Sequence, residues 1–428
     1  MTDPTALSRA DAARLWMSSR ENPMVVTAVL PLDGALDLAE LRRLLRERLL
    51  GHARFRSRIE LSSVPWEPPR WREVSEIDLD HHVARLALPR GSTDAAVERA
   101  VSGLASTPLS IRRPPWRAWV IDNAGHGSVV VVRVHHAIAD GMALLGVLFA
   151  VSDEGEGSFP APEEDAPRPR FSRASLPAPR EVVRGAGALG RLVLQRADHG
   201  ITLDGPLSPH KRVAWSRSID VEAVRRAAHE HDAHVNDLVL AALSGALRRS
   251  LSTPPARPLH ALVPVALGPA TGELGNRYAS VFVDLPVHLD HAGDRLTAVR
   301  EASRVARGSA GLSLGNALVD VLGTVGGVAR RAGVKLLSRR ASVVESNVAG
   351  PPVPLHVGGR TITALRFAAP SPGAIPMSAS VASYAGGLSL TVMADAHLRV
   401  APEEITRRFD DELSSLVTAA PEGGHSVA

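Results

Sequence analysis

The sequence lacks cysteine, is poor in aromatic residues and contains almost no lysine. With no Cys among 428 residues, disulfides, thiolate metal sites and a Cys nucleophile are all excluded. Aromatic residues make up only 4%, which argues against stacking of nucleic-acid bases on aromatic side chains. Lys occurs only at Lys211 and Lys335, and the formal net charge is +4. We therefore expect no nucleic-acid partner.

Long hydrophobic runs are also missing. No segment reaches the roughly 18 uncharged apolar residues of a membrane-spanning helix, and the first residues lack the basic and apolar regions of a signal peptide. The nearest apolar stretch, residues 312–329, is rich in Gly and is followed by Arg330 and Arg331. We expect a cytoplasmic protein with reversible, peripheral membrane contact at most, for which this stretch and its basic flank would suit an anionic surface. The alternative for this stretch is an ordinary core helix.

Composition divides the chain into two ordered parts. Hydrophobic residues make up 45% and charged residues 22%, which is typical of a globular protein. Residues 152–180 are instead rich in Glu, Pro, Ser and Arg, as linkers are. The sequence therefore predicts an N-terminal domain over residues 1–151, a crossover over 152–180 and a C-terminal domain over 181–428.

Strand and helix patterns alternate in both parts, which predicts an α/β layered fold. Strands are expected at residues 24–30, 129–134, 261–267 and 280–285, and a hairpin over 378–394 around Ala385-Gly386-Gly387. Helices are expected at residues 6–22, 38–49, 141–151 and 405–416, and two more begin behind the caps Asp220 and Asn236.

The most informative stretch is Val134-His135-His136-Ala137-Ile138-Ala139-Asp140-Gly141. The two His end a predicted buried strand, where alternation places their imidazoles on opposite faces. At most one of them points into a given cavity, and an imidazole titrating near neutrality suits a general base there. Asp140 is expected to cap the next helix or to pair with an Arg, and Gly141 to permit a tight turn.

Other interpretations compete with catalysis by this pair. Two His with satisfied hydrogen bonds beside a helix cap are a common structural element. Zinc ligation is a second possibility. The candidate ligand groups are, first, His135, His136 and Asp140 and, second, His229, His231, Asp232 and His234. We expect no metal, since the second group lacks the i, i+4 pairing of a metallohydrolase helix. The segment Gly311-Leu312-Ser313-Leu314-Gly315 fits a G-x-S-x-G elbow, but polar helix-like residues precede it where that elbow needs a strand.

The His-His-x-x-x-Asp-Gly stretch resembles that of the bacterial wax ester synthase / acyl-CoA:diacylglycerol acyltransferase family. That family belongs to the wider group of CoA-dependent acyltransferases and peptide-synthetase condensation domains. The resemblance runs nearly end to end, in the same order. Further similar segments are Leu7-Ser8 with Asp11, Asp78-Leu79-Asp80-His81-His82-Val83, Arg113-Pro114-Pro115-Trp116, Leu203-Asp204-Gly205-Pro206, Val235-Asn236-Asp237, Val263-Pro264-Val265 with Gly275-Asn276, Ser346-Asn347-Val348-Ala349-Gly350-Pro351, and Ser383-Tyr384.

The resemblance implies two chloramphenicol-acetyltransferase-like subdomains that form a pseudo-dimer with an active-site tunnel between them. It implies transfer of an acyl group from acyl-CoA to a long-chain alcohol or diacylglycerol, in a ternary complex with His136 as general base. Acyl-CoA is then a substrate, no cofactor is needed, and the protein is a monomer or homodimer. The other expected site residues are His135, Asp140 and Gly141 in the motif, Ser346, Asn347, Ser383 and Trp116 near substrate, and Asn236 and Asp237 as a structural motif.

Four features depart from the family pattern. Val25 stands where His is usual, Ser110 where Asp is usual, and Pro115 where Leu is usual. The segment Val263-Pro264-Val265-Ala266-Leu267-Gly268 also lacks the Arg that normally ends that strand. These departures keep open a specialised ester-forming acyltransferase of secondary metabolism, with a non-lipid acceptor or a carrier-protein donor. A non-catalytic binding protein of the same fold and a zinc hydrolase are the remaining alternatives.

Overall fold

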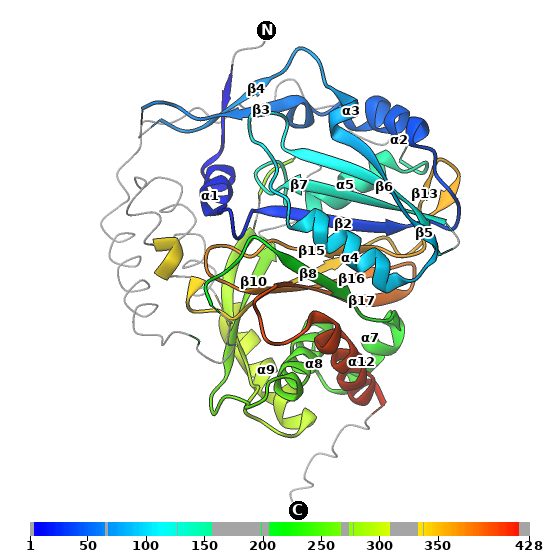
Figure 1. Cartoon of the computed structure of the whole chain (residues 1–428). Helices are drawn as coiled ribbons and strands as arrows, with labels where there is room; N and C mark the ends of the chain where they lie inside the picture. Colours follow the sequence, from blue (N-terminus) through cyan, green and yellow to red (C-terminus); the bar gives the residue numbers. More distant parts are fainter. Residues whose placement is uncertain are drawn as a thin grey trace, which may run out of the picture.

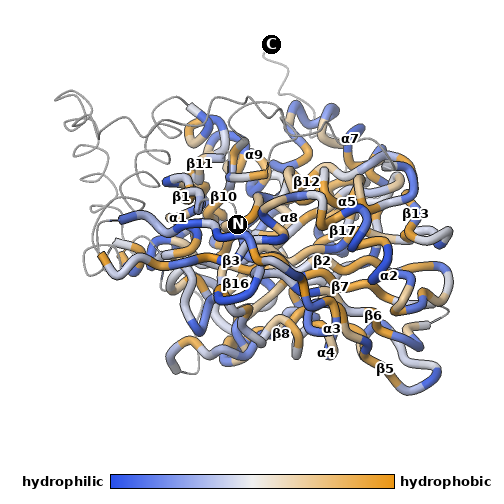
Figure 2. Tube along the Cα trace, turned by 90° about the horizontal axis from the view of Figure 1, so that it is seen from above, coloured by the Kyte–Doolittle hydropathy of each residue, from blue (hydrophilic) through white to orange (hydrophobic). Residues whose placement is uncertain are grey.

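The computed structural model describes residues 4–64, 67–125, 127–155, 198, 205–266, 274–276, 278–308, 333–336 and 338–418. Two layered α/β halves lie one above the other (Figure 1), each built around its own sheet. Hydrophobic stretches run mainly along the inner elements, and hydrophilic stretches gather toward the periphery (Figure 2). The expected α/β class and two-subdomain arrangement are therefore present.

The N-terminal half contains a five-stranded sheet in the order β15-β2-β7-β6-β5. Its central strand β7 reads Gly-Ser-Val-Val-Val-Val-Arg-Val-His, a β-branched run typical of a strand buried on both faces. Val130 and Val134 pack into one hydrophobic cluster, and Val129 and Val131 pack into another on the opposite face. In chain order the elements are β1 (Thr5–Ala6), α1 (Arg9–Met17), β2 (Val25–Pro31), α2 (Leu38–Leu44), η1 (Leu45–Leu49), η2 (Ala53–Arg56), β3 (Ser57–Glu60), β4 (Arg70–Glu73), α3 (Leu79–His82), β5 (Val83–Ser92), α4 (Asp94–Ala105), β6 (Trp116–Ala124), β7 (Gly127–His135) and α5 (Gly141–Val151).

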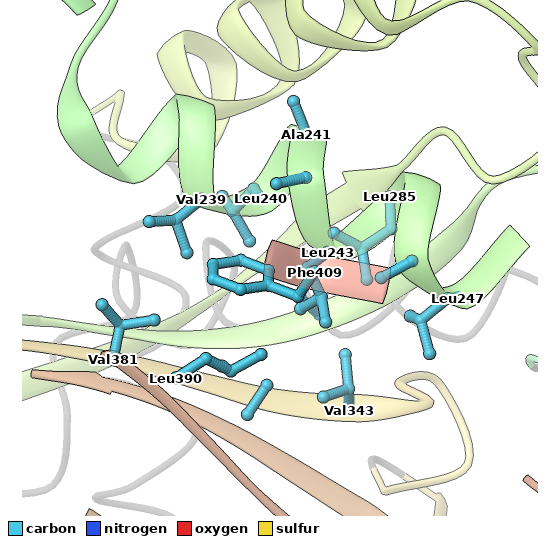
Figure 3. Close-up of a cluster of buried hydrophobic side chains, with 14 of the residues drawn as sticks. Val239, Leu240, Ala241, Leu243, Leu247, Leu285, Val343, Val381, Leu390 and Phe409 are labelled. Atoms are coloured by element: carbon cyan, nitrogen blue, oxygen red, sulfur yellow. The ribbon is translucent and has the colours of Figure 1, made fainter. Parts of the chain in front are cut away.

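The C-terminal half contains a sheet in the order β11-β10-β12-β16-β17-β8, with β9 beside β17. Helices α7, α8, α9 and α12 cover one face of it (Figure 1). Phe409 of α12 lies among α8 side chains such as Leu243 and above the strand residues Val381 and Leu390 (Figure 3). The elements are β8 (Lys211–Trp215), β9 (Ile219–Asp220), α7 (Val221–Glu230), α8 (Val235–Ser250), β10 (Leu259–Ala266), β11 (Tyr278–Leu285), α9 (Ala292–Ala306), β12 (Val343–Ala349), β13 (His356–Val357), β14 (Arg360–Thr361), β15 (Arg366–Ala368), β16 (Met377–Tyr384), β17 (Gly387–Asp395) and α12 (Pro402–Thr418).

The two halves exchange structure at their junction. Strand β15 follows β14 in the chain but pairs with β2 at the edge of the N-terminal sheet, with Phe367 opposite Ala28. In the other direction, α4 of the N-terminal half covers the edge strand β8. Ser102 Oγ accepts from the Val213 amide at 2.8 Å, and Glu98 Oε1 accepts from the Trp215 amide at 3.0 Å. Helix α4 thereby satisfies backbone groups that an open sheet edge leaves unpaired.

Most predicted elements are confirmed within a few residues. The helix over 141–151 has the expected bounds, and Asp140 caps it by accepting from the Ala143 amide at 3.0 Å. The C-terminal hairpin is present as β16 and β17. The helix expected over 6–22 is shorter, because Ser8 caps it and it ends at Met17.

The prediction that Asn236 caps a helix is wrong. Helix α8 begins at Val235, with His234 as its N-cap, and Asp237 Oδ2 accepts from the His234 amide at 2.9 Å. Asp237 thus reaches back from the third helical position, as in a capping box.

Several predictions concern residues that the structure does not describe. Residues 311–315, with their G-x-S-x-G pattern, the apolar stretch 312–329 and most of the crossover 152–180 lie outside the described residues. The boundaries of the two predicted domains and of the crossover between them stay a prediction.

Candidate active site

The histidine pair lies where β7 passes into α5. β7 ends at His135, and the His136 amide donates to the Met24 carbonyl at 2.7 Å. The chain then turns, with the Ile138 amide donating to the His135 carbonyl at 2.9 Å, before α5 begins at Gly141. The sequence therefore builds a rigid strand, a tight turn and a capped helix around the two imidazoles.

His135 contributes to this turn. Its Nδ1 accepts from the Ala137 amide at 3.1 Å, and its side chain is buried. Burial, with the neighbouring His136, lowers the pKa of His135 to about 3. A neutral imidazole that accepts a backbone hydrogen bond supports the loop.

His136 has a different environment. Only 7% of the residue is exposed, and its Nδ1 has no hydrogen-bond partner among the described residues. Its Nε2 lies 3.5 Å from the Tyr278 hydroxyl. Burial first, and then the positive charge of Arg14, lower the pKa of His136 to about 4. The imidazole is therefore neutral at physiological pH, which is the form that can accept a proton.

Arg14 and Tyr278 bring the two halves together over this imidazole. Arg14 lies on α1, and its Nε donates to the Tyr278 hydroxyl at 2.7 Å. The guanidinium carbon lies 4.4 Å from the centre of the Tyr278 ring, which is within cation–π range. Burial raises the pKa of Tyr278, so its hydroxyl keeps its proton and remains a donor.

A second set of contacts fixes the backbone of the turn between His136 and Asp140. Asn276 Nδ2 donates to the His136 carbonyl and to Asp11 Oδ1, both at 2.8 Å. Arg54 pairs with Asp11 at 3.1 Å and donates to the Ile138 carbonyl at 2.8 Å. The Asp140 amide donates to the Gly275 carbonyl at 2.9 Å. The loop at Gly275 and Asn276, from the C-terminal half, therefore fixes the motif of the N-terminal half.

Strand alternation separates three of the four residues expected near substrate, Ser346, Asn347 and Ser383. Val348 packs into a cluster with residues of the N-terminal half, so Ser346, two positions away on β12, points to that same face. Asn347 points to the opposite face, where its Nδ2 donates to Asn236 Oδ1 at 2.9 Å. Ser383 lies two positions from Val381, which packs among the covering helices. Of the three, Ser346 alone faces the half that carries His136.

Trp116, Asn236 and Asp237 make structural contacts. The Trp116 side chain is fully buried, donates from Nε1 to the Phe55 carbonyl at 2.8 Å and stacks on His82 at 4.5 Å. Asn236 Nδ2 lies 3.4 Å from Glu345 Oε2, and Asp237 pairs with Arg307 at 2.9 Å. Burial raises the pKa of Glu345 to about 8, so this carboxyl is protonated at neutral pH.

Sequence reasoning missed Arg14, Arg54 and Tyr278 as site residues. Arg14 and Tyr278 are 264 positions apart in the sequence. The one local signal is that Arg14 lies among apolar residues of a predicted helix. An Arg that is buried in such a place needs a partner. In the described part of the chain, no three His, Asp or Glu side chains gather closely enough to hold a metal ion. The helices described there are also too short or too polar to cross a membrane.

Two α/β halves meet at a buried histidine pair, which is the fold of peptide-synthetase condensation domains. Solved structures share this fold. The first condensation domain of the calcium-dependent antibiotic synthetase is 16% identical, with a TM-score of 0.63, over 98% of this chain and 97% of that one. A wax ester synthase/diacylglycerol acyltransferase from Marinobacter aquaeolei VT8 is 23% identical, with a TM-score of 0.68, over 96% and 98%.

The chain belongs to the wax ester synthase/diacylglycerol acyltransferase family. The model of that family's catalytic domain matches residues 7–239, and the model of its C-terminal domain matches residues 274–417. A Mycobacterium tuberculosis (strain H37Rv) protein named a probable diacylglycerol O-acyltransferase is 27% identical over 87% of this chain and 86% of its own length. Another protein of that strain, named for the same activity, is 30% identical over 86% and 82%. The family resemblance expected from the motifs is confirmed.

Proposed function

We propose that this protein is an O-acyltransferase that moves an acyl group from acyl-CoA to an alcohol, either a long-chain alcohol or diacylglycerol. Membership of an acyltransferase family supports the reaction class. The observation that carries the proposal is the neutral, buried imidazole of His136 at the junction of the two halves. A general base needs this protonation state and a fixed position.

The proposed reaction proceeds in a ternary complex. His136 Nε2 takes the proton of the alcohol while the alcohol oxygen bonds to the thioester carbonyl carbon. The tetrahedral intermediate then collapses, the carbon–sulfur bond breaks, and the imidazolium returns the proton to the departing thiolate. The products are an ester and free CoA. No Cys is present to form an acyl-enzyme, which favours direct transfer.

The alternative acceptor or donor rests on the departures from the family pattern. Val25 lies directly opposite His135 in the register of β2 and β7, so the change from the usual His alters the surface beside the motif. A non-lipid acceptor of secondary metabolism, or a carrier-protein donor, is the second candidate. For a long-chain substrate we also propose peripheral contact with lipid surfaces, since such chains partition into apolar phases.

A donor and acceptor screen tests the function. Purified protein is incubated with acyl-CoA donors from acetyl to stearoyl and with hexadecanol, diacylglycerol or short alcohols. A thiol reagent reports CoA release without background, because the chain has no Cys, and mass spectrometry identifies the ester. We expect ester formation with a long-chain acceptor. Thioester hydrolysis without ester, or no turnover with any pair, would contradict the proposal.

A further inference from the structure

The Tyr278 hydroxyl occupies a special place beside His136. It lies 3.5 Å from Nε2, which is too long for a strong hydrogen bond. Its oxygen already accepts from Arg14 Nε at 2.7 Å, so its own proton is free to be donated elsewhere. A phenol that accepts a hydrogen bond from a cation is a better donor in turn.

The geometry suits a reacting carbonyl. Catalytic sites place the attacking group's base and the oxyanion donor each roughly 3 Å from the reacting atoms. His136 Nε2 and the Tyr278 hydroxyl are 3.5 Å apart. One tetrahedral carbon can therefore present its alcohol oxygen to the imidazole and its carbonyl oxygen to the hydroxyl.

The local charge suits a developing anion. Arg14 is 2% exposed and Tyr278 is tilted against the imidazole, with ring centres 5.7 Å apart. The neutral imidazole and neutral phenol add no charge, and the guanidinium brings a positive one. Fixed donors in a water-poor site stabilise negative charge more strongly than water-exposed ones. The other charged group that acts on His136, Asp140, is the N-cap of α5.

We propose that Tyr278 is a second catalytic residue, whose hydroxyl donates to the thioester carbonyl oxygen as that oxygen becomes negative, and that Arg14 is the positioning residue for this hydroxyl. The inference rests on the acyl transfer proposed above. No bond of Tyr278 breaks. Its proton is shared with the oxyanion in the tetrahedral intermediate and stays on Tyr278 when the carbon–sulfur bond breaks and the carbonyl re-forms.

The test replaces each of the chain's two tyrosines in turn. Tyr278→Phe keeps the ring over which Arg14 lies and removes the hydroxyl alone. Tyr384→Phe is the matched control, because its buried hydroxyl accepts from the Leu355 amide at 2.7 Å. We expect Tyr278→Phe to lower kcat about 10²–10³-fold with little change in KM, and to lower the melting temperature as well, because the buried Arg14 Nε loses its acceptor. Tyr384→Phe should lower the melting temperature and leave kcat unchanged.

A double variant separates contact with the substrate from action through the imidazole. If the hydroxyl only orients His136, Tyr278→Phe costs nothing further in a His136→Ala background. If it touches the oxyanion, the residual rate of His136→Ala falls again, by about tenfold or more. We expect the second result, and the first overturns the proposal.

The pH profile identifies the part played by Arg14. Removing its charge with Arg14→Met should move the acid limb of kcat/KM to higher pH, whereas Tyr278→Phe should leave that limb in place. Transfer by the wild-type protein with full activity in Tyr278→Phe overturns this inference alone. Absence of transfer by the wild-type protein on the whole substrate panel overturns the proposed function and this inference together.

Discussion

His136→Ala is expected to remove acyl transfer and, at the same time, to flatten the pH dependence of stability. Loss of a general base costs about 10²–10⁴-fold in rate. The stability effect has a separate origin, because the folded protein holds this imidazole neutral while the unfolded chain lets it titrate normally. The two effects together distinguish a buried base from an ordinary structural His.

The magnitude follows from the pKa of His136, which is about 4 in the folded protein against an ordinary value of 6.5. Between these values the unfolded chain binds a proton that the folded protein excludes, so stability falls as the pH decreases. Full stability is present above pH 6.5 and is lost progressively toward pH 4. From pH 8 to pH 5 this one group removes about 2 kcal/mol. The cavity left by Ala costs stability too, but by the same amount at every pH.

Urea unfolding followed by Trp fluorescence at pH 8, 6.5 and 5 measures both the cost of the cavity and the pH-dependent change in stability. At pH 8 the wild-type protein and the variant differ by the cavity alone. By pH 5 the gap should have shifted by about 2 kcal/mol in favour of the variant. Parallel stability curves would show that His136 is not buried in its neutral form. Near-normal turnover by the variant, measured as CoA release, would refute its role as base.

The sequence predicts the local geometry of the motif well, because that geometry depends on neighbours. A β-branched run makes β7, Asp140 caps α5, and both features lie within a few residues of the histidine pair. The same holds for the hairpin at Ala385, which has φ +46° beside Gly386. Turn, strand and cap each have a local physical cause, so a pattern in the sequence is sufficient.

Contacts between the halves are not local, and the sequence gives little sign of them. Nothing near Arg14 predicts Tyr278, and nothing near Phe367 predicts that β15 completes the sheet of β2. The sequence predicted Asn236 as the cap of α8, but the cap is His234, whose amide donates to the Asp237 side chain. His234, Asn236 and Asp237 are all polar, so the sequence alone does not show which of them begins the helix.

Three further predictions concern other parts of the chain. Asp140→Ala should lower stability by about 0.5–2 kcal/mol through loss of the α5 cap, which thermal melts measure; unchanged melting with lost turnover would instead make Asp140 catalytic. Flotation with anionic vesicles should be strong at low salt and weak at high salt if the protein contacts lipid peripherally; no flotation at low salt contradicts that contact. Glu345→Gln should make the protein more stable than wild type at pH 8 and little different at pH 5. The Glu345 pKa is about 8 in the folded protein against an ordinary value of 4.5, so the folded protein holds a proton that the unfolded chain releases between those values. Stability from this group is present below pH 4.5 and is lost as the pH rises toward 8, by on the order of 3 kcal/mol. Gln keeps the shape and cannot ionise, so urea midpoints from pH 5 to pH 8 should diverge in its favour, and midpoints that stay parallel would show that Glu345 is ionised in the folded protein.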